Sequence, residues 1–131
     1  MKVVNMRHII TASLAYFAVV FAAAVVMGAL RVTFIAPQVG ALIAVAFEVP
    51  VILGLAWVVA GRVLRRWPLD AGQRIAMGAM AFAILMISEF VLATLVFARP
   101  AASYIAAMAT LPGALGLAGQ VGFALVPVLR R

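Results

Sequence analysis

The stretch AFEVPVILG, residues 46–54, places a glutamate and a proline inside a long apolar run. A carboxylate within a hydrophobic span is energetically costly, which makes Glu48 a candidate functional residue. The surrounding run extends from about residue 38 to residue 64 and is long enough to cross a bilayer as one helix. This stretch therefore predicts a transmembrane helix with an acid near its centre.

Three further apolar runs, at about residues 9–31, 71–98 and 111–129, have similar character. The 131-residue chain is 69% hydrophobic and only 10% charged, whereas soluble proteins are about one half apolar. It has no cysteine, so disulfides and thiolate chemistry are excluded. We predict an all-α integral membrane protein: a single transmembrane domain, residues 1–131, built as a bundle of four transmembrane helices.

The first run follows a basic N-terminal segment, a pattern that signal peptides share. The apolar stretch from Ile9 to Leu30 is longer than the roughly 7–15 residues of a signal-peptide core and can span a bilayer. We expect a retained helix, with a cleaved signal peptide as the alternative.

Prolines and a capping pattern predict the helix boundaries. Pro37 disfavours helical backbone in the residue before it, so we expect the second helix to begin between residues 37 and 40. Asp70 followed by Gln73 matches a capping box and predicts the start of the third helix at about residue 71.

The segment 101–110 is apolar but carries hydroxyl side chains, and Pro112 follows it. We expect a short interfacial helix or a loop before the last span. One long bent helix from Ala101 onward is the alternative. Four glycines in the last span predict close backbone packing against neighbouring helices: Gly113, Gly116, Gly119 and Gly122.

The basic residues predict the orientation. Eight of the ten flank one side of the predicted spans, and Arg31 and Arg99 flank the other. Because cytoplasmic loops are enriched in Lys and Arg, we expect both termini in the cytoplasm, in a bacterial cytoplasmic (inner) membrane. The basic face would contact anionic lipid headgroups. Nucleic-acid binding is not expected, since no basic face with interleaved aromatic residues is present. The eight basic residues on the predicted cytoplasmic side are Lys2, Arg7, Arg62, Arg65, Arg66, Arg74, Arg130 and Arg131.

Glu48 and Glu89 lie at matching depth. They are 14 residues before Arg62 and 15 residues after Arg74, roughly 21–22 Å from these markers at helical rise. Gln120 also falls within the bilayer, roughly 15 Å from its helix end by the same rise. Because a short connection joins the second and third helices, we expect them to be antiparallel neighbours, which would let the two carboxylates meet.

Two carboxylates close together in a low dielectric cannot both stay ionised without a cation. Arg31 and Arg99 are the candidate counter-ions, and interfacial anchoring is the simpler interpretation of both. Ser88 and Gln120 are candidate hydrogen-bond partners. Pro50 is expected to kink its helix beside Glu48, because it cannot donate to the carbonyl of residue 46.

No set of nucleophile, base and orienting residue is present, so we do not expect an enzyme, a metal site or a cofactor. His8 is the single histidine.

Two functions fit the acids. The first is ion- or proton-coupled transport of a small solute by a homo-oligomer, through a site around the paired glutamates. The second is a non-catalytic accessory, assembly or structural subunit of a larger membrane complex, in which the acids hold helices together.

Overall fold

The computed structural model describes residues 2–96, 98 and 100–130, and within these ranges it is helical with no strand. Four helical segments are long and apolar enough to span a membrane: Met6–Val39, Ala41–Arg66, Ala71–Val96 and Leu111–Leu129. In lipid, backbone groups must be satisfied within the segment, which is why such apolar runs form helices. The all-helical fold class, with four helices long and apolar enough to span a membrane, is therefore confirmed.

The first segment is longer than predicted. Helix α1 (Lys2–Leu30) continues through a π-helical turn, η1 (Arg31–Ile35), into a short helix, α2 (Ala36–Val39). Pro37 does not break this helix, contrary to the prediction. A proline ring collides with the carbonyl four residues earlier in a regular α-helix, and a wider π turn is one way in which a membrane helix accommodates it.

The chain reverses at Gly40, whose φ of 89° and ψ of 158° lie in a region that favours glycine. Helix α3 (Ala41–Arg66) then runs back along the bundle. Helix α4 (Ala71–Val91) begins with the predicted capping box: Asp70 accepts from the Gln73 backbone, and the Gln73 side chain accepts from the Asp70 backbone. This prediction is confirmed.

A second π-helical turn, η2 (Leu92–Val96), extends α4. A short helix, α5 (Ala101–Ala107), and a turn at residues 108–110 then lead into α6 (Leu111–Leu129). Segment 101–110 is therefore a helix followed by a turn, and the alternative of a single helix from Ala101 is wrong.

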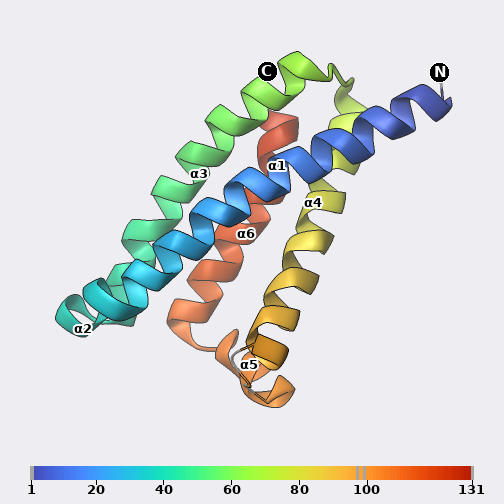
Figure 1. The fold of residues 1–131 in the computed structure, drawn as a ribbon. Helices are drawn as coiled ribbons and strands as arrows, with labels where there is room; N and C mark the ends of the chain where they lie inside the picture. Colours follow the sequence, from blue (N-terminus) through green and yellow to red (C-terminus); the bar gives the residue numbers. More distant parts are fainter. Residues whose placement is uncertain (1, 97, 99, 131) are drawn as a thin grey trace.

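The packing order of the helices differs from the prediction. Helix α3 packs on α1 and α6, and α4 packs on the same two helices, so α3 and α4 lie diagonally across the bundle (Figure 1). The expectation that the second and third helices are direct neighbours is wrong. Their short connection crosses one end of the bundle, where α1 begins and α6 ends.

Side chains of α1 and α6 fill the space between α3 and α4. The Tyr16 ring stacks on Phe123 at 4.4 Å, and its hydroxyl donates to the Phe123 carbonyl at 2.6 Å. Ser13 is fully buried beside α4 and donates to the carbonyl of Ile9 at 2.6 Å. A buried hydroxyl needs such a partner. The Ser13 hydroxyl also lies 3.4 Å from the Met77 carbonyl of α4, so Tyr16 and Ser13 link α1 to α6 and to α4.

Glycines bring α6 close to both α3 and α4. Gly119 and Gly122 lie against the side chains of Val49 and Leu53 on α3, which confirms the predicted close packing at these positions. Gly116 instead has no atom within 4 Å of where a Cβ would stand. The closest approach of α6 to these two helices involves Gly78 of α4, where a Cβ would overlap the Ala124 carbonyl. Gly113 lies as close to the Ala107 carbonyl of α5.

Candidate functional site

A cavity of about 380 Å³ lies inside the bundle, between α1, η1, α3, α4 and α6. Its lining is mostly apolar but includes both intramembrane glutamates. Four of the residues singled out from the sequence face it together: Arg31, Glu48, Glu89 and Gln120. The two carboxylates thus share one cavity although α3 and α4 do not pack on one another.

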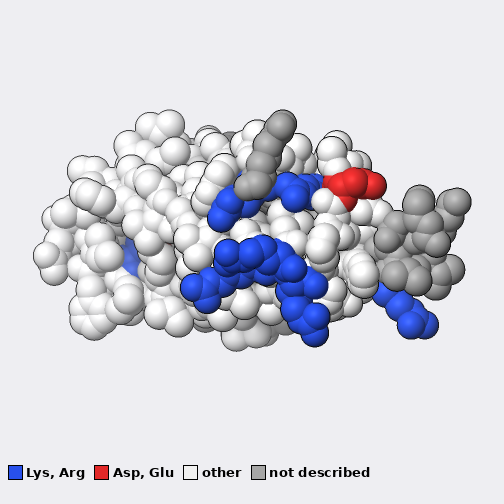
Figure 2. Space-filling model, turned by 90° about the horizontal axis from the view of Figure 1, so that it is seen from above, with Lys and Arg blue, Asp and Glu red and all other residues white. Residues whose placement is uncertain are grey.

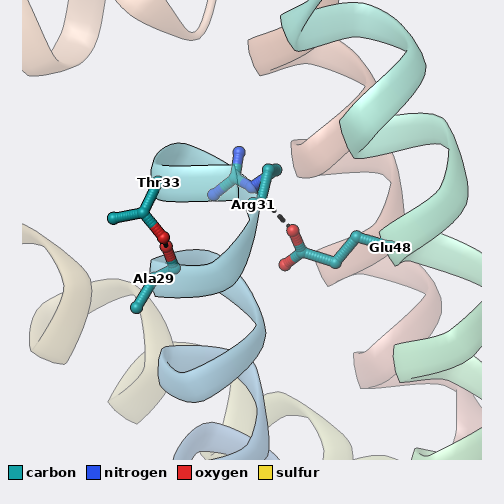
Figure 3. A network of polar contacts seen from close by, with 4 residues as sticks. All are labelled: Ala29, Arg31, Thr33 and Glu48. Atoms are coloured by element: carbon teal, nitrogen blue, oxygen red, sulfur yellow. Dashed lines mark hydrogen bonds and ion pairs between the residues drawn. The ribbon is translucent and has the colours of Figure 1, made fainter. Parts of the chain in front are cut away.

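Arg31 and Glu48 form an ion pair across this cavity. The Arg31 Nε lies 2.7 Å from the Glu48 Oε1, joining η1 to α3 (Figure 3). Both contacting atoms are out of reach of solvent, while the two side chains as a whole are 31% and 19% exposed. The charge of Glu48 is therefore compensated within the protein.

Arg31 is placed for this pair by the continuation of its helix. From the sequence, interfacial anchoring is the simpler interpretation of Arg31, because long Arg side chains usually extend outward to the headgroups. The helix instead runs on to Val39, so Arg31 lies eight residues before the end of the segment. The hydroxyl of Thr33 donates to the carbonyl of Ala29 at 2.6 Å, on the same turn (Figure 3).

Glu89 is surrounded by neutral donors. The side-chain amide of Gln120 on α6 donates to the Glu89 Oε1, and the hydroxyl of Tyr104 on α5 lies 3.5 Å from the same oxygen. Tyr104 is held by an edge-on contact with the ring of Phe90. Within residues 2–96, 98 and 100–130, Glu89 forms no ion pair. The other proposed counter-ion, Arg99, lies outside the described residues.

The two glutamates therefore differ in charge compensation. Glu48 has a cation at contact distance, whereas among the described residues Glu89 contacts only hydrogen-bond donors. They are not bonded to each other in the part of the chain that the structure describes. An acid in an apolar cavity without a fixed cation is stabilised by a bound proton or by a cation from solution. A carboxylate in such surroundings can accept a proton.

Two of the candidates from the sequence do not face the cavity. Ser88 is half-buried, and Pro50 is exposed on a helix that continues unbroken past it. Pro50 follows Glu48 by only two residues, which turns it to a different face of α3. Neither residue lines the space that holds the carboxylates.

Residues at the α5–α6 end of the cavity were not predicted from the sequence. Thr110, which caps α6 by accepting from the Gly113 backbone at 3.2 Å, also lines the cavity. Tyr104 reaches Glu89 from α5. The hydroxyl residues of segment 101–110 were the available signal, but their contact with the third span depends on how the chain turns there.

The fold and cavity define a class: a small integral membrane protein with four membrane-spanning helices and a charged cavity between them. No protein-family model, curated protein or solved structure matches the chain. Among the described residues, no three His, Asp or Glu side chains gather where they could hold a metal ion.

Proposed function

We propose that the protein is a small ion- or proton-coupled membrane transporter whose coupling site is the cavity of Arg31, Glu48, Glu89 and Gln120. One observation carries the proposal: both intramembrane carboxylates face the same 380 Å³ cavity, but within residues 2–96, 98 and 100–130 only Glu48 forms an ion pair. Intramembrane acids that face a cavity typically mark ion or proton pathways.

The two carboxylates have different roles in this proposal. Glu89 takes up and releases the coupling proton or cation, and Gln120 orients its carboxylate by hydrogen bonding. The Arg31–Glu48 pair stays charged and joins η1 to α3 beside the site. Because the cavity touches α5 and the start of α6 at one end, occupation of Glu89 can be coupled to the packing of those elements.

The membrane, the orientation in it and the oligomeric state are part of the same proposal. We propose a bacterial cytoplasmic (inner) membrane protein with both termini in the cytoplasm, supported by the eight basic residues on one side of the spans. We also propose that it forms a homo-oligomer, because four helices alone enclose little volume for a solute path.

Proton flux into proteoliposomes that contain the purified protein tests this function. We expect Glu89→Gln to abolish flux, because glutamine cannot release a proton. Asp70→Asn is the matched control, since Asp70 is the third acid of the chain and caps α4 away from the cavity. Asparagine also caps helices well, so flux should persist. If Glu89→Gln transports as well as the unchanged protein, the proposal fails.

The second candidate, an accessory subunit of a larger membrane complex, is favoured by a different observation. The Arg31–Glu48 and Gln120–Glu89 contacts each join two helical elements, as polar contacts with a purely structural role would. Under this alternative, Glu48→Gln and Glu89→Gln change the partners or the oligomeric state seen by mass measurement of the purified protein, and proton flux is absent throughout.

A further inference from the structure

The lining of the cavity that holds both glutamates indicates what kind of molecule it binds. Among the described residues, its polar side chains are Arg31, Glu48, Glu89, Thr110 and Gln120, and the other lining residues are apolar or glycine. A water molecule inside a protein needs several polar partners, so a mostly apolar cavity is poorly suited to water. The volume of about 380 Å³ falls in the range of roughly 300–1,000 Å³ that small-molecule sites have. These features favour an organic occupant with a large apolar part.

Two aromatic rings in the cavity lining are held in place by stacking. Phe123 stacks on Tyr16 at 4.4 Å, and Phe21 stacks on Phe17 at 5.0 Å. Side chains that are already fixed lose little entropy when a ligand binds. Aromatic rings contact apolar groups well and also attract a cation near the ring face. The lining therefore suits an apolar body that carries positive charge.

The charges in the lining favour a single positive charge on the occupant. One arginine and two glutamates leave the described lining with a formal net charge of minus one when all three are ionised. Arg31 lies 2.7 Å from Glu48, whereas Glu89 accepts from the neutral side chains of Gln120 and Tyr104. A carboxylate in an apolar space is neutralised by a proton or by a cation. A molecule with one positive charge can therefore replace a proton at Glu89.

An inorganic cation fits this cavity less well. Hard cations such as Ca²⁺ and Mg²⁺ take about six oxygen ligands. Within the described part of the chain, side-chain oxygens line the cavity only from Glu48, Glu89, Thr110 and Gln120, and one Glu48 oxygen already contacts Arg31. An organic cation needs one such contact, because its apolar body packs against the rest of the lining.

The basic end of the bundle lies away from the cavity. Figure 2 looks onto the end where α1 begins and shows Lys and Arg side chains gathered there. The cavity lining includes Ala41 at the start of α3 and Thr110 just before α6, and both helices start at the opposite end of the bundle (Figure 1). A cation in the cavity is therefore separated from most of the charges that would repel it.

We propose that the cavity binds a small organic cation with an apolar body and one positive charge, which pairs with the Glu89 carboxylate in exchange for a proton. This inference rests on the transport function proposed above and names the class of its solute. The exchange is balanced: the protonated Glu89 releases one proton to water, and the cation takes the place of that proton, so the charge of the cavity stays the same.

The charged and titratable groups around Glu89 leave it as the exchanging acid. They are Arg31 from η1, Glu48 from α3 and Tyr104 from α5. The described lining residues of α1 and α6 include no charged or titratable side chain. Arg31 and Glu48 compensate each other.

Two glycines give a matched pair of variants. Gly116 in α6 and Gly54 in α3 both lie in helix interiors, and neither has an atom within 4 Å of its Cβ position. Gly116 lines the cavity, one helical turn before Gln120, whereas Gly54 does not line it. Leucine at position 116 therefore fills part of the cavity, and leucine at position 54 lies outside it. Both changes raise helix propensity.

The test titrates the full chain in uncharged detergent with benzyltrimethylammonium, a permanent cation, and with neopentylbenzene, a neutral molecule of the same shape, and follows binding by calorimetry. We expect the cation to bind saturably and about tenfold more tightly than the neutral analogue, as one charged contact implies. Glu89→Gln and Gly116→Leu should each weaken binding of the cation about tenfold or more, while Asp70→Asn and Gly54→Leu leave it within about twofold.

The pH dependence of the unchanged protein gives a test that needs no variant to fold. Because the charge of the probe is fixed, a proton competes with it only on the protein. Within about pH 4–9, affinity should fall as the pH falls, approaching tenfold per pH unit where Glu89 is mostly protonated. In that acidic range, about one proton should be released for each cation bound. Affinity that is independent of pH, equal affinity for the neutral analogue, or equal weakening by both leucine variants overturns the inference.

The outcomes separate this inference from the transport proposal. Proton flux that Glu89→Gln abolishes, without saturable binding of benzyltrimethylammonium, supports transport and overturns the organic cation as its solute. Binding that depends on Glu89, without proton flux, supports the cation site and overturns transport.

Discussion

The contact with Glu48 determines how the charge of Arg31 affects the stability of the protein. Its Nε is buried against Glu48, and in the part of the chain that the structure describes neither contacting atom has another partner. An ion pair removed from water contributes little net stability, because desolvation offsets the attraction. Removing one partner is more costly, since the remaining charge is left uncompensated.

This asymmetry predicts a non-additive double mutant. We expect Arg31→Gln to lower the free energy of unfolding by about 1–3 kcal/mol, between the values for exposed and fully buried pairs. Glu48→Gln in the same protein should recover much of that loss. Unfolding in detergent mixtures, measured for the two single variants and the double variant, gives the coupling energy. Additive losses would show that Arg31 and Glu48 do not stabilise the protein as a pair.

At the scale of the elements, α6 is the central helix of the packing. It contacts both α3 and α4 through glycines, and its Phe123 ring stacks on Tyr16 of α1. Association of helices in lipid depends on such close packing, because apolar side chains gain little by leaving lipid for protein. The position of the cavity follows, since α6 diverges from its neighbours where Gly116 has open space beside it.

The closest of these contacts gives a second prediction. Gly78→Ala places a methyl group against the Ala124 carbonyl and should lower the free energy of unfolding by about 1–3 kcal/mol.

Gly54→Ala is the control, because Gly54 lies within α3 with no atom within 4 Å of its Cβ position. Alanine has the higher helix propensity, so this variant should be neutral or more stable by up to about 1 kcal/mol. Thermal unfolding of both variants, compared with the unchanged protein, measures the difference. Equal stability of the two would show that α4 and α6 do not approach as closely as described.

Local sequence patterns predicted the parts of the fold that depend on local physics. Apolar length predicted the four spans, and Asp70 with Gln73 predicted a helix start that the structure confirms. The neighbours of each helix depend on tertiary packing, which is why the adjacency of the second and third helices was predicted wrongly. For the candidate site, the number of residues from the basic helix ends predicted that Glu48 and Glu89 lie at the same depth in the membrane. Arg31 and Gln120 were among the predicted candidate partners, but which acid each of them contacts could not be predicted. That assignment depends on the helix continuing past Pro37 and on the turn that brings Tyr104 back.

For the whole molecule, the arrangement of the helix ends gives a topological prediction. Helix α1 begins, α6 ends and α3 passes to α4 at the same end of the bundle (Figure 1). Most of the basic residues belong to this end, including Arg65 and Arg74. A reporter fused to the C-terminus should therefore be active if it requires the cytoplasm and inactive if it requires export. The reverse pattern would contradict the proposed orientation.

The length of the first membrane segment has a consequence for the lipid around it. Its 34 residues form a rod of about 51 Å at helical rise, whereas the hydrocarbon layer is about 30 Å thick. A rod of that length has to tilt, bend or extend beyond the layer, and a change in acyl-chain length changes the balance among these responses. Because Arg31 lies eight residues before the end of this rod, we expect its distance from Glu48 to change with hydrophobic mismatch. We therefore expect membrane thickness to act on the geometry of the cavity that holds both glutamates.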